Sequence, residues 1–269
     1  MTAQRENAQT FRALQAPGKL LILPNAWDAA SARAAEDAGA AAIATSSAAV
    51  AWSHGYPDGE MLPAATLIAA VKEIVRVVKV PVSADGEGGY SADPAKAASF
   101  VAALIDSGAA GINLEDGSAP PELLAAKIKA IKSAMKAKDV DVFINARADV
   151  YLCNQVPDDA KLAEAIRRGN LYREAGADGL FVPALTELAG IREVVRAVDL
   201  PFNSLIQKAL PPIAELKAAG VRRVSAGAGI SRAAYGAAMR ATKMLLEEGK
   251  YDAIFASSGD CPEFNKLFG

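Results

Sequence analysis

Short runs of apolar residues alternate with longer segments of helical spacing from one end of the chain to the other. Most of the short runs are apolar at every position rather than at every second one. This pattern is typical of strands in a parallel sheet whose two faces are both covered. We therefore predict eight strands, at residues 20–24, 41–45, 80–84, 111–114, 142–145, 179–182, 201–204 and 223–226.

The segments between these strands carry the usual signals for helix starts and ends. Asp93 stands before Pro94 as a predicted N-cap, and a glycine stands just past the end of each of four clear helices. Eight units of strand and helix predict an α/β protein, a (β/α)8 TIM barrel that residues 1–269 form as a single domain. The four helices are predicted at residues 28–38, 94–107, 158–175 and 212–219.

Two segments fall outside the eight units. Residues 3–15 predict an extra N-terminal helix, and residues from about 250 to 269 predict a helical tail after the last barrel helix. The tail carries Phe255, Phe264 and Phe268. Because apolar side chains on a terminal segment have to pack somewhere, we expect the tail to cover this barrel or a partner subunit.

Composition narrows the class of protein. A chain of 269 residues with 52% hydrophobic residues can bury a large core, which excludes a disordered protein. A net charge of −2 without a basic cluster gives no reason to expect nucleic-acid binding. No apolar run approaches the roughly 20 residues that span a bilayer, and the N-terminus lacks signal-peptide features. We expect a cytoplasmic protein without a membrane partner, in which Cys153 and Cys261 are free thiols.

The strongest chemical signal follows the third predicted strand. Asp85 and Glu87 stand two positions apart among three glycines, and on an extended backbone such residues point to the same face. Two like charges at that spacing repel each other unless a cation lies between them. Oxygen ligands suit Mg²⁺ or Mn²⁺ better than zinc. The alternative is a pair of solvated acids at a strand end that runs into a glycine turn.

Polar residues also follow most of the other predicted strands. In a (β/α)8 barrel the carboxyl ends of the strands share one rim, where active sites lie. Structural alternatives remain for single residues: Asp28 as a helix cap, Asp149 as a turn residue and Asp58 as a solvated loop acid. Together the residues favour a divalent-metal site that faces an anionic substrate, with Arg147 as a carboxylate or phosphonate clamp. The candidates are Trp27, Ser46, Ser47, Asp58, Asp85, Glu87, Glu115, Arg147 and Asn203.

Four blocks of the sequence resemble the isocitrate lyase/phosphoenolpyruvate mutase superfamily. They are residues 45–60, residues 83–89, Asn113-Leu114-Glu115-Asp116 and Asn145-Ala146-Arg147. They occur in the family's order, and the resemblance extends from about residue 18 to about residue 240 by the strand pattern. No single block would be a strong signal, but the four together are.

The resemblance implies a Mg²⁺-dependent enzyme that acts on a small-molecule 2-oxo carboxylate through an enolate of the pyruvate type. Asp85 matches the direct metal ligand, whereas Asp58, Glu87 and Glu115 match acids that hold the metal largely through water. Ser46 and Ser47 match the loop that binds the substrate, Arg147 matches the substrate-binding arginine, and Asn203 matches a polar contact from the seventh strand. Trp27 is a further substrate-binding candidate, and Asp58, Arg147 and Ser46 are the catalytic candidates. The family's exchange of the last helix between subunits implies a homodimer or homotetramer.

Departures from the family pattern narrow the reaction. Isocitrate and methylisocitrate lyases carry a Lys-Lys/Arg-Cys-Gly loop, whereas here Glu115 is followed by Asp-Gly-Ser-Ala-Pro-Pro. The same gap removes the loop Lys and Asn used near a phosphonyl group, which makes P–C bond chemistry less favoured. The carboxyphosphonoenolpyruvate phosphonomutase-like branch remains. We favour cleavage of a C–C bond in a 2-oxo or 2-hydroxy dicarboxylate, with oxaloacetate decarboxylation first.

The sequence leaves the proton donor open among His54, Tyr56 and Tyr151. It also leaves other functions open. A phosphonate mutase or hydrolase would be a relative of the favoured enzyme. An enzyme of phosphorylated metabolites could bind phosphate at residues 225–229. A non-catalytic protein that binds a 2-oxo acid could retain the metal acids without the acid–base loop.

Overall fold

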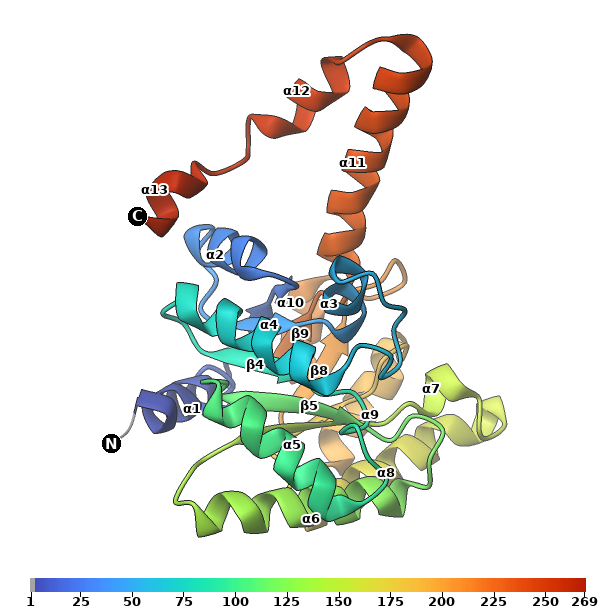
Figure 1. Cartoon of the computed structure of the whole chain (residues 1–269). Coiled ribbons are helices and arrows are strands. Elements are labelled where there is room, and N and C mark those ends of the chain that lie inside the picture. The colour runs from blue at the N-terminus through green and yellow to red at the C-terminus, as the bar shows by residue number, and fades with distance from the viewer. Residues whose placement is uncertain (1–2) are drawn as a thin grey trace.

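The predicted (β/α)8 barrel is confirmed by a computed structural model, which describes residues 3–269 (Figure 1). Nine parallel strands form one sheet in the order β1-β9-β8-β7-β6-β5-β4-β3-β2. Since β1 and β2 follow each other in the chain, the two ends of the sheet meet and the ring closes. The strands are β1 Leu21–Leu23, β2 Asn25–Ala26, β3 Ile43–Thr45, β4 Val82–Asp85, β5 Gly111–Glu115, β6 Phe143–Arg147, β7 Gly179–Phe181, β8 Phe202–Leu205 and β9 Arg223–Ser225.

The ninth strand arises because the first predicted strand is divided at Pro24. Leu21 of β1 pairs with Arg223 of β9, whereas Asn25 of β2 pairs with Ala44 of β3. Proline has no N–H with which to continue a ladder, so the strand changes its partner there. The single strand expected at residues 20–24 is therefore two short pieces.

The helices begin and end close to the predicted positions. Asp28 accepts a hydrogen bond from the Ser31 amide at 2.7 Å, and Asp93 accepts one from the Ala95 amide at 2.8 Å. The helix expected at 158–175 is a 3-10 turn, η1 Asp158–Ala160, followed by α8. The helices are α1 Ala3–Ala13, α2 Ala29–Asp37, α3 Ser47–Ser53, α4 Ala64–Val77, α5 Pro94–Asp106, α6 Pro121–Ala137, α7 Val150–Cys153, α8 Lys161–Ala175, α9 Leu188–Ala197, α10 Ile213–Ala218, α11 Gly229–Glu248, α12 Asp252–Ser258 and α13 Phe264–Phe268.

The extra N-terminal helix α1 closes the amino end of the barrel. Phe11 is fully buried, and its ring meets the edge of Phe143 with 5.3 Å between ring centres. Arg12 fixes the helix from outside by ion pairs to Asp141 at 2.8 Å and to Asp178 at 2.6 Å. Helix α1 is thus an apolar plug held by charged contacts.

Replacing Phe11 by alanine is expected to lower the free energy of unfolding by about 3–5 kcal/mol, because it leaves a cavity in a packed core. Denaturant unfolding followed by circular dichroism measures the change. Met61→Ala is the control, since that side chain is 59% exposed and its loss should cost almost nothing. A Phe11→Ala protein as stable as the control would show that the plug is not part of the core.

The last barrel helix does not cover the barrel. Helix α11 projects away from the sheet and α12 follows its far end, whereas α13 lies back beside α2, where Arg33 Nε donates to Leu267 O at 3.3 Å (Figure 1). Of the 20 residues of α11, all of which are described, only Ser231 is buried. The outward-facing Ile22 in the middle of β1 is consequently 54% exposed. No helix among residues 3–269 is both long and apolar enough to cross a membrane.

Candidate functional site

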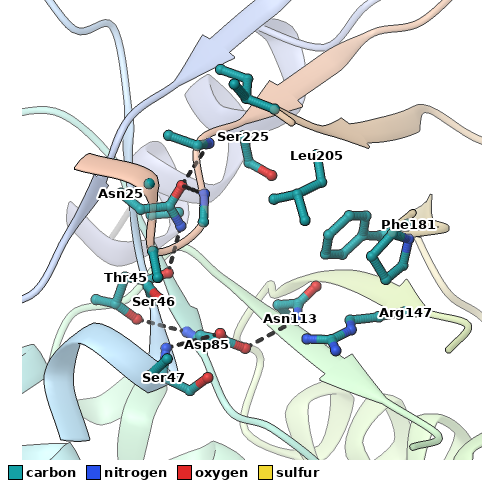
Figure 2. Close-up of a pocket in the computed structure, with 18 of the residues that line it drawn as sticks. Asn25, Thr45, Ser46, Ser47, Asp85, Asn113, Arg147, Phe181, Leu205 and Ser225 are labelled. Carbon is teal, nitrogen blue, oxygen red and sulfur yellow. Dashed lines mark hydrogen bonds between the residues drawn. The ribbon is translucent and has the colours of Figure 1, made fainter. Parts of the chain in front are cut away.

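A cavity of about 340 Å³ lies at the carboxyl ends of the strands. Residues from eight of the nine strands and from the loops after them line it, so that distant parts of the sequence meet there (Figure 2). Several predicted residues are brought together in this cavity. They are Ser46, Ser47, Asp58, Asp85, Arg147 and Asn203.

Asp85 at the end of β4 is held by three hydrogen bonds. Its Oδ2 accepts from the Ser47 amide at 3.0 Å, and its Oδ1 accepts from Asn113 Nδ2 at 3.0 Å. Its own amide donates to Thr45 Oγ1 at 2.8 Å. The carboxylate is therefore fixed at the cavity wall before any ligand arrives (Figure 2).

Glu87 does not continue the extended strand as the sequence predicted. Strand β4 ends at Asp85, and Glu87 lies in the following turn with a φ of 48°. Gly86 permits this turn, because a Cβ there would come within 2.7 Å of Ile112 Cδ1. Glu87 lines a neighbouring cavity of about 420 Å³, where it accepts hydrogen bonds from the Glu60 amide and from the Tyr90 hydroxyl.

Burial and mutual repulsion raise the pKa values of two acids in this region. Burial, together with the charges of Asp85 and Asp58, raises the pKa of Glu87 to about 7. Burial raises the pKa of Glu115 to about 8, although Arg147 acts in the opposite direction. Such a concentration of negative charge would be relieved by a cation among these carboxylates.

The donor set fits a hard cation that keeps much of its water. Within residues 3–269, no three acids, histidines or cysteines converge closely enough to bind one ion directly. Asp85 could ligate an ion from the cavity wall, and Asp58, Glu87 and Glu115 could hold its water. Magnesium binds in this way, through one or two carboxylates and several waters, and oxygen donors do not suit zinc.

Arg147 is tied to two carboxylates. Its Nη1 lies 2.7 Å from Glu115 Oε2, an ion pair too bent to be a hydrogen bond, and its Nε donates to Asp149 Oδ1 at 2.6 Å. The Asp149 amide in turn donates to Asp116 at 2.8 Å, and Asp116 is buried against Arg168. Asp149 is therefore an orienting partner of Arg147 rather than a solvated turn residue.

The backbone amides of Ser46 and Ser47, which follow β3, are already engaged in hydrogen bonds within the protein. The Ser46 amide donates to Ala26 O, and the Ser47 amide donates to Asp85. Ser46 Oγ accepts from the Ala49 amide at a long 3.4 Å as the cap of α3. Their hydroxyl groups, both at the cavity, are the donors that remain.

Two other candidates lie outside the cavity. Trp27 packs on Tyr235 with 6.1 Å between ring centres and lines a different, apolar cavity with Ile22. His54 ends α3, and its Nδ1 lies 2.9 Å from Val50 O, within its own helix. The predicted substrate contact of Trp27 and a proton-donor role for His54 gain no support from these positions.

Sequence reasoning missed three residues of the site: Asn25, Asn113 and Arg223. Asn25 Oδ1 accepts from the amides of Ala226 and Gly227 at 2.9 and 2.8 Å, which occupies two donors of the proposed phosphate cradle. Asn25 follows the apolar run of β1 and could have been marked as a polar residue there, whereas Asn113 lies in the middle of β5. Arg223 stands at the start of its strand, and its inward direction follows only from the sheet register.

Comparison with known proteins agrees with this geometry. Residues 11–246 match the model of the family described as phosphoenolpyruvate phosphomutase. The chain belongs to this family. It is therefore a member of the isocitrate lyase/phosphoenolpyruvate mutase superfamily of enzymes, as the four sequence blocks predicted.

Proteins with different names are similar to this chain. An uncharacterized protein, Rv1998c of Mycobacterium tuberculosis, is 40% identical over 85% of this chain and 87% of its own. The 2-methylisocitrate lyase of Bacillus subtilis is 30% identical over 75% of this chain and 67% of its own. The crystal structure of a putative phosphonomutase from Burkholderia cenocepacia superposes with a TM-score of 0.83 at 38% identity, covering 92% of this chain and all of that one.

Proposed function

We propose that this protein is a Mg²⁺-dependent lyase that cleaves a C–C bond of a small 2-oxo or 2-hydroxy dicarboxylate, with oxaloacetate decarboxylation as the favoured reaction. Mn²⁺ could replace Mg²⁺, because both are hard cations that prefer oxygen ligands. The proposal is finer than the family, whose members include relatives named as lyases and as phosphonomutases.

One observation carries the proposal: Asp85 and Arg147 line the same cavity, where one can hold a cation and the other an anion (Figure 2). A 2-oxo acid carries two neighbouring groups that match this pair: its ketone oxygen attracts a cation, and its carboxylate attracts a guanidinium. The bound acid would lie between the two side chains, with the hydroxyls of Ser46 and Ser47 as further donors.

The residues present suffice for decarboxylation. When the C–C bond to the departing carboxylate breaks, CO₂ leaves and the electron pair moves toward the ketone oxygen. Bound Mg²⁺ would supply a Lewis acid that stabilises the charge on that oxygen. Arg147 fixes the carboxylate that is retained, and its own position is fixed by Asp149. Water can return the proton, so the reaction needs no acid from the loop that follows Glu115.

The test is pyruvate formation from oxaloacetate with Mg²⁺, with the metal alone as the blank and EDTA and oxalate as inhibitors. Turnover that both inhibitors abolish is expected. Metal-dependent oxalate binding without turnover would keep the site but direct the search to substituted malates and phosphonates, or to a protein that binds 2-oxo acids without catalysis. The absence of both oxalate binding and turnover would overturn the proposal.

We also propose that the protein forms a homodimer or homotetramer in which α11–α13 of one copy cover the barrel of another. The face left open by α11 includes Ile22, and the apolar cavity beside it measures about 920 Å³. Leu246 and Phe255 at the far end of α11 and on α12 are exposed by 78% and 68%. Exposed apolar surfaces of this kind, one on the barrel and one on α11 and α12, are typical of a subunit interface.

The double variant Leu246→Asp/Phe255→Asp is expected to shift the mass measured by light scattering from an oligomer to a monomer, because it buries two charges in the interface. Lys243→Asp, a charge change on an exposed side chain of the same helix, is the control. A wild-type protein that is monomeric at micromolar concentration would contradict this assembly.

A further inference from the structure

Arg223 lies inside the barrel, below the acids of the rim. In β9 it alternates with Ser225, and the register places it between Leu21 of β1 and Asn203 of β8. Its side chain is 3% exposed and forms part of the wall of the 340 Å³ cavity. A cation is thus built into the interior of the site, although residues 223–226 gave only a strand in the sequence.

Among the described residues, no carboxylate forms an ion pair with the guanidinium of Arg223. Its Nε and Nη1 are buried without a hydrogen-bond partner in the described part of the chain. On one side it lies 5.7 Å from the centre of the Phe11 ring, which is part of the apolar plug. Burial lowers the pKa of Arg223 to about 10, opposed by the more distant charge of Asp85. A buried, unpaired cation is costly and binds a suitable anion strongly.

Arg147 differs from Arg223 in this respect. Two carboxylates, Glu115 and Asp149, already contact Arg147, so much of its charge is spent on the protein itself. Arg223 makes no such ion pair among the described residues, and its Nε and Nη1 have no hydrogen-bond partner there. Within this cavity it is therefore the stronger candidate for a second anionic group.

Two other polar atoms of residues that line the cavity are also unpaired. Ser83 Oγ and Asn203 Oδ1 are buried without a hydrogen-bond partner in the described residues, and both residues line the cavity. The Ser83 hydroxyl can donate to an anion. The deep end of the cavity thus combines a cation and a hydroxyl below the level of Asp85.

We propose that Arg223 binds the second carboxylate of the substrate and so makes the site selective for dicarboxylates over monocarboxylates. The inference rests on the proposed function, since it assumes that the 2-oxo or 2-hydroxy acid end lies between Asp85 and Arg147. The dicarboxylate then spans the cavity from its rim to its deep end, with one arginine for each carboxylate. For oxaloacetate, the carboxylate at Arg223 is the one that departs, and Arg223 releases it as it loses its charge and becomes CO₂. The guanidinium fork can form two parallel hydrogen bonds to that carboxylate.

Displacement of bound oxalate by lactate and by malate, in the presence of Mg²⁺, tests this assignment because the two ligands differ by one carboxylate. The wild-type protein is expected to bind malate at least about 10-fold more tightly than lactate, as a charge-assisted bidentate pair allows. Arg223→Met should abolish that preference and leave the affinities for oxalate and lactate within about two-fold. Arg222→Gln is the matched control, since this adjacent half-buried arginine does not line the cavity.

Arg223→Lys provides a second variant that does not depend on how Arg223→Met folds. Lysine keeps the charge but loses the fork, so malate affinity should fall by less than in Arg223→Met. A malate preference that survives Arg223→Met, or that is lacking in the wild type, would assign Arg223 a structural role and overturn the inference. A wild-type protein that binds no oxalate with Mg²⁺ would instead overturn the proposed function, and the inference with it.

Discussion

Replacing Asp85 by alanine is expected to reduce Mg²⁺-dependent turnover by about 10³-fold or more, because the change removes the carboxylate that hydrogen bonds hold at the cavity wall as a ligand for a cation. Oxalate binding should be lost together with turnover. Steady-state kinetics and calorimetry with Mg²⁺ measure the two losses.

The fold should survive this substitution. The Ser47 amide and Asn113 Nδ2 lose their acceptor, at a cost of about 1–3 kcal/mol each if both stay buried and unpaired. Asp85→Asn retains one oxygen acceptor and separates the loss of charge from the loss of that contact. Asp106→Ala on the exposed surface of α5 is the control for a lost aspartate. Full turnover of Asp85→Ala in EDTA would refute the metal site.

Arg147→Met is expected to lower both activity and stability. The substitution leaves Glu115 and Asp149 without their cation, and breaking such a partly buried ion pair costs about 3–5 kcal/mol. Turnover should fall by about 10³-fold, because the substrate carboxylate loses its donor. Thermal unfolding and pyruvate formation measure the two effects.

A second substitution separates the two causes. Adding Glu115→Gln to Arg147→Met replaces the buried acid that has lost its cation, and should recover part of the stability but none of the turnover. Arg167→Met is the control, because Arg167 is half-exposed on α8 and its pairs with Glu164 and Glu122 contribute only about 0–1 kcal/mol. Equal losses from Arg147→Met and Arg167→Met would deny Arg147 a special role.

The sequence predicted the barrel well because its strands are buried on both faces and bounded by caps and glycines. The exception at Pro24 is local, since a missing N–H divides a strand but leaves the ring closed. The direction of α11 was beyond the sequence, which marked the tail as apolar but could not say that the helix leaves its own barrel.

The candidate site was predicted in part. Asp85 and Arg147 were found because acids and arginines at strand ends meet at one rim. Glu87 was assigned a strand geometry that it lacks, because the spacing of two residues does not reveal a left-handed turn. Arg223 was missed because its role depends on the register of β9 against β1 and β8, which no local pattern specifies.

Because α1 closes the amino end, the barrel is open to solvent at its carboxyl end only. With Phe11 packed against Phe143 at the amino end, traffic of small molecules has to use the opposite mouth, where the loop of residues 53–61 is exposed to solvent. Every reactant and every product has to pass through that single opening. Asp58, which belongs to this exposed loop, lines the cavity, so entering and leaving molecules pass beside it.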